Sequence, residues 1–315
     1  MTTKQFESVT AKLVLNRVKV ERMPFDWSLN PYRGCAHGCS FCYARAFQTF
    51  LGKEATDEFQ HHIFIKENAA EALESQLRTF GRRHGLRDTD VGPRIGPVAV
   101  GTATDPYQPI EAKARQTRRC LQVLARYRVP TSVTTRSPLV LRDLDVLRDV
   151  DVTSINISVN TLDAAIARKL EPASPHPAGR MRAVRALANA GFPVGIFVAP
   201  ILPLLTDGEE TLDALFAESK AQGAGFAMTS LLRLSPDVKM WYYHTLEMHF
   251  PELIQPYARL YRNAYVERSY ADKMKRRIEA VSARHGLPEP APVLRPSAAA
   301  PAPAKPLPEQ LSFAF

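Results

Sequence analysis

The feature that most constrains the fold is an alternation of strand-like and helix-like segments between residues 62 and 234. Short runs rich in β-branched residues, such as "PTSVTTRS" and "TSINISVN", alternate with amphipathic runs such as "AGRMRAVRALANAG". Strands that alternate with helices in this way build parallel sheets. About six such units are present, fewer than the eight of a complete TIM barrel. The sequence therefore predicts an α/β fold, a partial (β/α)6-type TIM barrel.

Some helices and their ends are predicted in more detail. The segments "PIEAKARQTRRCLQVLARYRV" and "LVLRDLDVLRDV" are each predicted to form one helix. Asn68 is expected to be the N-cap of the helix that follows it, and Gly191 is expected to close another helix as its C-cap. Glu111 stands where a helix begins and would there favour the helix dipole.

Composition divides the chain into four parts. Residues 1–25 form a mixed N-terminal extension, and residues 26–235 form the predicted barrel. Residues 236–286 are rich in aromatic residues and are predicted to be a C-terminal helical region. Residues 287–315 are rich in Pro and Ala and are predicted to be a disordered tail that ends in an apolar peptide.

The 315-residue chain contains no apolar run long enough to span a membrane. Its N-terminus lacks the charged start and the apolar core of a signal peptide, so we expect a cytoplasmic location. Clustered cysteines in that compartment bind metal more often than they form disulfides. The net charge of +9 fits a polyanionic partner such as nucleic acid, although a basic surface that is merely solvated explains it equally well.

Three of the four cysteines lie in one short stretch, "NPYRGCAHGCSFCYARAF". Cys35, Cys39 and Cys42 have the spacing Cys-x3-Cys-x2-Cys, so their thiolates can converge on one metal centre. With His37 as a fourth ligand they would form a zinc site. Without a fourth ligand they would hold a [4Fe–4S] cluster that has one open iron. A two-cysteine redox motif is a weaker interpretation, because it leaves Cys35 unexplained.

The triplet, with Phe41 before its third cysteine, resembles the signature of the radical S-adenosylmethionine (SAM) superfamily. The segments "NPYRGC", "CYAR", "TDPYQPIE", "TTRS", "ISVN" and "LEP" resemble the subgroup around spore photoproduct lyase, and the resemblance covers residues 30–234. It implies that the three cysteines ligate a [4Fe–4S] cluster whose open iron binds SAM. An external electron donor would then allow reductive cleavage of SAM to a 5′-deoxyadenosyl radical, which abstracts hydrogen from a substrate.

The same resemblance implies further SAM contacts, mainly at the carboxyl ends of the strands. Related proteins often have Lys where Arg136 stands, and Arg can hold the SAM carboxylate bidentately. For each polar residue the alternative is a helix cap or a surface ion pair. The implied cofactor-binding residues are Phe41, Tyr43, Thr104, Asp105, Arg136, Ser137, Ser158, Asn160, Glu171 and Arg180.

The sequence departs from the subgroup at one position that matters for the reaction. Spore photoproduct lyases carry a hydrogen-donating cysteine where this chain has Thr102, and the O–H bond of threonine is too strong to replace a thiol. Tyr107 or another tyrosine is the alternative donor. Cys120 lies on the apolar stripe of a helix and is expected to be a core residue. The reaction class is therefore implied, whereas repair of a photoproduct by the same route is not.

Three functions remain open from the sequence. The first is a radical SAM enzyme, lyase-like, that acts on nucleic acid such as damaged DNA. The second is the same chemistry on a small molecule or a protein, and the third is a zinc- or cluster-containing module that binds nucleic acid without catalysis. Aromatic and basic residues interleave between Trp241 and Arg277, which suits nucleic acid, but most of these tyrosines are expected to pack on the barrel.

The last residues, "EQLSFAF", resemble the short peptide by which bacterial DNA-processing proteins bind the sliding clamp. A flexible Pro/Ala linker before it is what a tethered docking peptide needs. The alternative is a tail that folds back onto its own domain. The expected anchors are Gln310, Leu311, Phe313 and Phe315.

Overall fold

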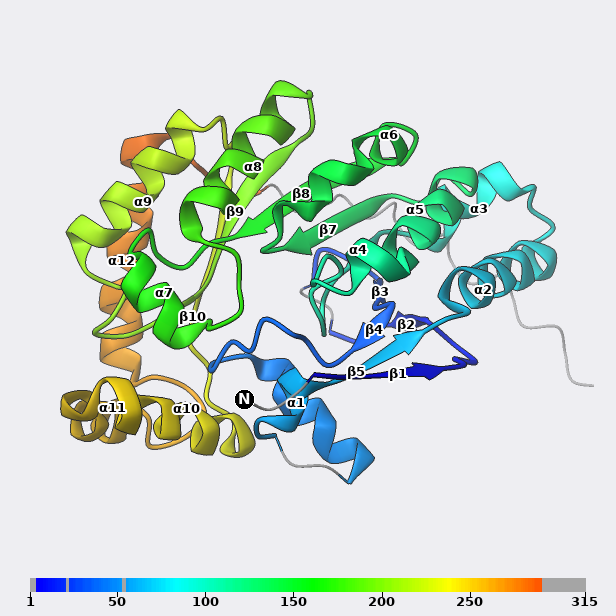
Figure 1. The fold of residues 1–315 in the computed structure, drawn as a ribbon. Coiled ribbons are helices and arrows are strands. Elements are labelled where there is room, and N and C mark those ends of the chain that lie inside the picture. Colours follow the sequence, from blue (N-terminus) through cyan, green and yellow to red (C-terminus); the bar gives the residue numbers. More distant parts are fainter. Residues whose placement is uncertain (1–3, 21–22, 53–54, 291–315) are drawn as a thin grey trace, which may run out of the picture.

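The computed structural model describes residues 4–20, 23–52 and 55–290 (Figure 1). Most of the predicted tail lies outside these residues, and so do the expected clamp anchors Gln310, Leu311, Phe313 and Phe315, so clamp docking stays a prediction. The first residues of the predicted tail pack on the barrel. Leu287 is fully buried, and the carbonyl of Pro288 accepts a hydrogen bond from Ala227 N at 3.0 Å.

The main sheet has the strand order β10-β9-β8-β7-β6-β3-β2. In this sheet β3, β6, β7, β8, β9 and β10 run parallel to one another, and β2 pairs antiparallel with β3. Within the described residues this gives six parallel strands, which confirms the partial (β/α)6 barrel. The bounds are β2 (Leu15–Arg17), β3 (Trp27–Leu29), β6 (Val98–Val100), β7 (Thr131–Thr135), β8 (Val152–Ser158), β9 (Val194–Ile201) and β10 (Ala227–Leu231).

A second sheet of three strands has the order β1-β5-β4. In it β1 (Gln5–Val9) runs parallel to β5 (His62–Lys66), and β4 (Tyr32–Arg33) pairs antiparallel with β5. The predicted N-terminal extension therefore contributes one strand to each sheet. Because β4 ends two residues before Cys35, the cysteine loop begins at the small sheet and lies beside the main one.

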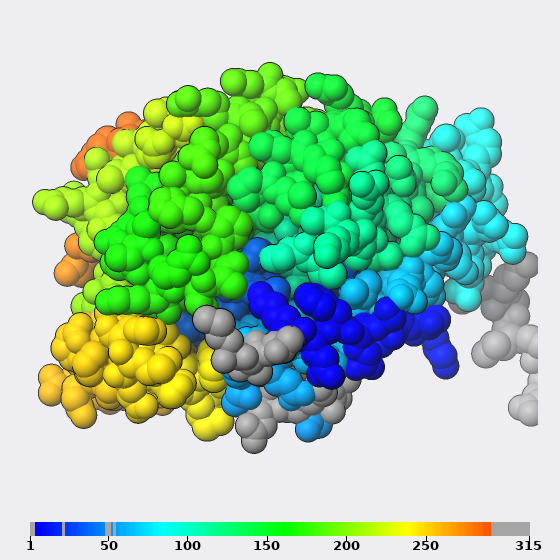
Figure 2. Space-filling view, viewed as in Figure 1, coloured from blue at the N-terminus to red at the C-terminus, as the bar shows by residue number. Residues whose placement is uncertain are grey.

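Helices cover the outer face of the main sheet, and further helices follow its last strand (Figure 1). In the space-filling view residues 236–260 (yellow) and the N-terminal residues (dark blue) lie below the barrel (Figure 2). The bounds are η1 (Tyr43–Leu51), α1 (Glu58–His61), α2 (Ala69–His84), α3 (Asp88–Ile95), α4 (Glu111–Ala114), α5 (Gln116–Arg126), η2 (Pro138–Asp143), α6 (Leu144–Leu147), α7 (Ala164–Leu170), α8 (Pro177–Asn189), α9 (Glu209–Ala221), α10 (Pro236–His249), η3 (Pro251–Leu253), α11 (Ile254–Leu260) and α12 (Arg268–His285).

Two of the predicted helices are divided in the structure. The first splits into α4 and α5 at Arg115, whose φ is 52°. The carboxylate of Glu111 accepts hydrogen bonds from Thr117 N at 3.0 Å and Arg118 N at 3.2 Å, so it caps α5 rather than lying along one continuous helix. The second splits into the 3-10 helix η2 and the single turn α6.

The two predicted caps have different outcomes. Asn68 precedes α2, but its side chain makes no cap bond and instead exchanges hydrogen bonds with the backbone of Ala11 at 2.8 and 2.9 Å. It therefore ties the N-terminal segment to the barrel. Gly191 has a φ of 85° and lies one residue beyond the C-cap Ala190 of α8, where glycine commonly ends a helix.

The C-terminal helices pack on the barrel through tyrosines. Tyr242, Tyr257 and Tyr261 are fully buried, and the Tyr257 hydroxyl donates to the carbonyl of Pro203 at 2.6 Å. Packing is therefore confirmed for these residues, whereas Tyr265 stays 62% exposed. Cys120 is fully buried in the main core, as expected. None of the described helices is both long and apolar enough to cross a membrane.

Replacing Gly92 with Ala should destabilise the fold, because a Cβ atom there would collide with the backbone carbonyl of Arg128. We expect a loss of about 3 kcal/mol in the free energy of unfolding, measured by urea denaturation. Gly179→Ala in α8 is the matched control, since its Cβ would find no atom closer than 3.8 Å and should stabilise the chain by about 0.5 kcal/mol. Equal stability of the two variants would contradict the close packing at Gly92.

Candidate functional site

The cysteine loop lies where the two sheets meet. Cys35 and Cys39 are buried, and Cys42 is half-buried. Gly34 has a φ of 77°, and a Cβ atom there would come within 2.7 Å of the carbonyl of His62, so the loop lies against the backbone of β5. Burial raises the pKa of the Cys39 thiol to about 12, so the metal-free chain favours the neutral thiol there.

Residues after β6 hold this loop in place. The Thr104 hydroxyl donates to the carbonyl of Gly34 at 2.6 Å. The amide of Gln108 donates to the same carbonyl at 3.3 Å and accepts from Ala36 N at 2.9 Å. Thr104, an implied SAM contact, therefore supports the loop. Gln108 was not among the expected site residues, although it lies in the segment "TDPYQPIE" that resembles the subgroup.

Asp105 fixes the end of β7 and the middle of the cysteine loop. Its carboxylate accepts hydrogen bonds from Arg136 N at 2.7 Å and from Thr135 Oγ1 at 2.6 Å, and it lies 3.2 Å from His37 Nε2. Burial opposes its ionised form, but His37 and these hydrogen bonds outweigh burial and hold the pKa of Asp105 at about 2. Asp105 thus links the end of β7 to His37 in the cysteine loop.

His37 is not placed as a zinc ligand. Besides the contact with Asp105, its Nδ1 lies 3.3 Å from the carbonyl of Ala173. In the part of the chain that the structure describes, no group of three or more His, Cys, Asp or Glu side chains is arranged to hold a single metal ion. The cysteines of a [4Fe–4S] cluster each bind a different iron, so they need not converge on one point. Because both ring nitrogens of His37 face protein oxygens, His37 is not positioned to be the fourth ligand of a zinc site.

A buried ion-pair system lies beyond Cys39. Glu171 pairs with Arg180, and its other oxygen lies 3.4 Å from Arg136 Nε. Burial opposes ionisation of Glu171, but Arg180 and Arg136 outweigh it, so the pKa of Glu171 is lowered. The guanidinium of Arg136 lies 5.9 Å from the centre of the Phe41 ring, which places two implied SAM contacts together.

Arg180 is not free to bind a cofactor directly. Its Nε donates to the carbonyl of Pro175 at 2.8 Å, and its Nη1 donates to the carbonyl of Ser158 at 3.1 Å. Its remaining nitrogen pairs with Glu171. In this structure Arg180 therefore positions Glu171 and the end of β8, and a direct contact with SAM stays a prediction.

Buried polar atoms without a partner mark where a polar group would bind. Ser158 Oγ and Asn160 Oδ1, at and just beyond the end of β8, are buried and make no hydrogen bond in the described structure. Such atoms normally find a partner, so they fit the ribose or the amino-acid part of a bound cofactor. Ser137 differs, because its Oγ accepts from Leu139 N at 3.3 Å and caps η2.

The structure separates the two expected catalytic residues. The Tyr43 hydroxyl donates to the carbonyl of Thr102, so Tyr43 is the tyrosine that the fold brings to Thr102. The Thr102 hydroxyl accepts from Asn30 Nδ2 at 3.0 Å. Tyr107 is fully buried in the main core, where burial, Asp143 and Glu111 raise its pKa. Tyr107 is therefore not brought to the cysteine loop.

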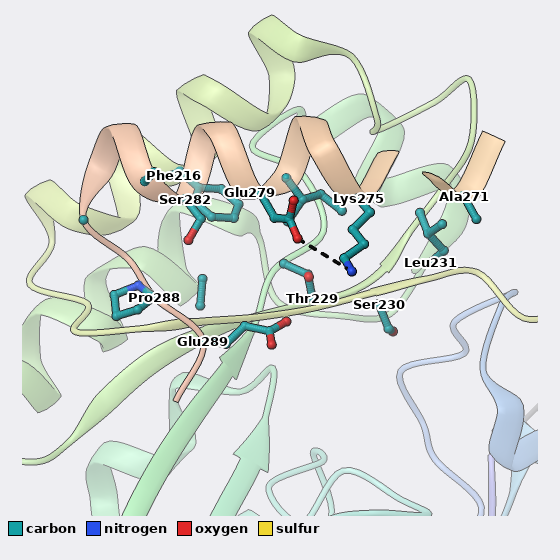
Figure 3. Close-up of a pocket in the computed structure, with 14 residues that line it drawn as sticks. Phe216, Thr229, Ser230, Leu231, Ala271, Lys275, Glu279, Ser282, Pro288 and Glu289 are labelled. Atoms are coloured by element: carbon teal, nitrogen blue, oxygen red, sulfur yellow. Dashed lines mark ion pairs between the residues drawn. The ribbon is translucent and has the colours of Figure 1, made fainter. Parts of the chain in front are cut away.

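A separate cavity of about 580 Å³ lies between β10 and α12 (Figure 3). Thr229, Ser230 and Leu231 line it from the strand, and the ion pair between Lys275 and Glu279, 3.8 Å apart, lines it from the helix. None of the expected site residues contributes to its lining, so this cavity is distinct from the cysteine loop.

Asp105→Asn should cost the metal-free chain about 2 kcal/mol of unfolding free energy at neutral pH. The stabilisation by the Asp105 carboxylate is fully present above its unfolded pKa of about 4. It is lost as the pH falls through its folded pKa of about 2. The difference between wild type and variant in urea unfolding should therefore shrink between those two pH values, and a constant difference would contradict the prediction.

Comparison with known proteins shows similar chains in distant organisms. An uncharacterized protein from Mycobacterium tuberculosis is 32% identical over 287 residues, which are 90% of this chain and 81% of that protein. An uncharacterized protein from Methanocaldococcus jannaschii is 25% identical over 245 residues, which are 78% of this chain and 83% of that protein.

Solved structures show the same fold. Spore photoproduct lyase complexed with dinucleoside spore photoproduct matches with a TM-score of 0.66 and 16% identity over 90% of this chain and 81% of that one. A mutant of that enzyme with bound AdoMet matches with a TM-score of 0.64 and 18% identity over 90% of this chain and 80% of that one. The sequence model of the radical SAM superfamily matches residues 29–215. The chain therefore belongs to the radical SAM superfamily, whose members use a [4Fe–4S] cluster and S-adenosylmethionine.

Proposed function

We propose that this enzyme cleaves SAM reductively to a 5′-deoxyadenosyl radical, which abstracts hydrogen from a nucleic-acid substrate. The cleavage of SAM is supported mainly by the cysteine loop. It is supported further by Ser158 Oγ and Asn160 Oδ1 near the end of β8, which are buried and have no hydrogen-bond partner. The cluster supplies the electron and the open iron for SAM. The protein supplies orientation and shielding from water.

The residues around the loop divide this work. Cys35, Cys39 and Cys42 would hold the cluster. Arg136 is the cation best placed for the SAM carboxylate, because Glu171 fixes its guanidinium beside the ring of Phe41. Ser158 and Asn160 would bond the polar part of SAM through their unpartnered oxygens. The carboxylate of Asp105 and the guanidinium of Arg180 already bond protein groups through all their polar atoms, so these two residues would position the others.

The nucleic-acid half of the proposal has three supports. The fold matches that of spore photoproduct lyase, which was solved with a dinucleoside. The net charge of this chain is +9. Beyond the end of β10, Arg233 lies 5.1 Å from the ring centre of Tyr265, and Tyr265 is 62% exposed. An exposed aromatic ring with an adjacent cation is a platform on which a base can stack.

The lyase-like part of the function is limited by Thr102. A thiol that returns hydrogen to a product radical has no counterpart at this position, because the O–H bond of threonine is too strong to replace a thiol as hydrogen donor. Damaged DNA is thus the first substrate to screen, whereas the bond broken and the hydrogen donor have to be found from the product.

Tyr265→Ala should weaken binding of a single-stranded oligonucleotide by about tenfold, because a stacked base contributes roughly 1–3 kcal/mol. Fluorescence anisotropy at a fixed moderate salt concentration measures this. Phe6→Ala is the control, since Phe6 is also an exposed aromatic residue but lies on β1, in the small sheet. If both variants bind like wild type, or if wild type itself does not bind, the platform is not a nucleic-acid site.

The reaction class is tested by anaerobic reconstitution with iron and sulfide, then reduction with dithionite in the presence of SAM. Wild type should bind about four irons per chain and form 5′-deoxyadenosine. Cys39→Ala should lose both, whereas Cys120→Ala should keep both, because Cys120 is buried in the main core. Zinc without iron in the wild type, or full activity of Cys39→Ala, would refute the proposal.

A further inference from the structure

Arg45 is a fully buried cation whose hydrogen-bond partners among the described residues are all neutral groups. It lies on η1, three residues after Cys42, and none of its surface is exposed. Its Nε donates to the carbonyl of Cys39 at 2.9 Å, and its Nη2 donates to the carbonyl of Gly38 at 3.1 Å and to Gln60 Oε1 at 2.7 Å. Its Nη1 donates to the carbonyl of Thr56 at 2.7 Å.

No described Asp or Glu forms an ion pair with this guanidinium. Aromatic rings enclose it instead: its central carbon lies 5.3 Å from the ring centre of Phe59 and 4.7 Å from that of Trp241 on α10. A charge that is buried without a counter-charge is expensive, and Arg cannot escape the cost by losing its proton. The buried positive charge of Arg45 therefore has no negative partner among the described residues.

The cysteine loop is the segment that Arg45 bonds most directly, since its guanidinium donates to the carbonyls of Gly38 and Cys39. A described acidic side chain that acts on Arg45 electrostatically is Asp57. The Asp57 side chain is 45% exposed, so water screens it. The missing partner therefore lies on the side of the cysteine loop.

We propose that Arg45 is the buried counter-cation of the iron–sulfur cluster held by Cys35, Cys39 and Cys42. Three thiolates outweigh the positive charge of the cluster core, so the ligated cluster is anionic. Reduction adds another negative charge. Arg45 therefore stabilises the loaded chain over the metal-free chain and the reduced cluster over the oxidised one, which makes the midpoint potential less negative.

This inference rests on the cluster of the proposed function but not on its substrate. It also explains why the cation is an arginine. The loop turns its Gly38 and Cys39 carbonyls toward the guanidinium, which has enough donors in a fixed fork to bind both and still reach Gln60. Arg45 thus supports the backbone of the loop and balances the charge of its contents.

The first test measures the midpoint potential of the cluster in the reconstituted full-length chain, by a redox titration that is monitored by EPR. Arg45→Met should shift the potential to more negative values, and Arg45→Lys, which keeps the charge, should restore most of the shift. Gln60→Met removes a neutral acceptor of Arg45 and should leave the potential unchanged. A wild-type potential in iron-loaded Arg45→Met, or the same shift in the Lys variant, would overturn the proposal.

A second measurement covers variants that load poorly. Iron loss to a chelator should be faster in Arg45→Met than in Gln60→Met, by roughly 10–100-fold. The thermal stabilisation gained on loading should also be smaller in Arg45→Met than in wild type. If Arg45→Met lowers the stability of the metal-free and loaded chains equally, its role is only structural and the proposal fails. If wild type itself binds no cluster, the proposed function is wrong. That outcome is distinct from one in which wild type binds a cluster but Arg45 does not affect it.

Discussion

The structure depends on a short loop whose backbone has to be satisfied by side chains from elsewhere. Few of its own groups pair within it, among them Gly38 N with Cys35 O and Cys42 N with Cys39 O, both at 3.3 Å. Arg45 donates hydrogen bonds to the carbonyls of Gly38 and Cys39. Gln108 accepts a hydrogen bond from Ala36 N and donates one to the carbonyl of Gly34. Since unpaired buried backbone groups are costly, these side chains fix where the cysteines lie.

Two buried carboxylates, those of Asp105 and Glu171, fix the strand ends beside the cysteine loop through hydrogen bonds and ion pairs. Asp105 is ionised although it is buried, because backbone and side-chain donors from β7 and the contact with His37 surround it. Glu171 is held in the same way by Arg180 and Arg136. Both carboxylates are satisfied by the protein, whereas Ser158 Oγ and Asn160 Oδ1 are not. The two carboxylates therefore stabilise the site, whereas the two unpartnered oxygens are the atoms that we propose to contact SAM.

The C-terminal helices take part in the site rather than only covering the barrel. Trp241 on α10 stacks on Arg45, which bonds the backbone of the cysteine loop. The loop after α11 carries Tyr265, which stacks with Arg233 beyond the last strand. The same region thus contacts both the cluster support and the exposed platform proposed for nucleic acid.

The sequence by itself determined the parallel barrel and the three cysteines, because both are written as local patterns: alternating periodicity in one case and fixed spacing in the other. It did not reveal that "PIEAKARQ" breaks at Arg115, since that break depends on how the Glu111 carboxylate is used in three dimensions. Nor did it separate Tyr107, in the core, from Tyr43, beside Thr102. Only the tertiary structure decided that Arg180 bonds Glu171 and the end of β8, and that no described acidic side chain pairs with Arg45. These bonds depend on how the loops fold in three dimensions, and no periodicity or spacing in the sequence records them.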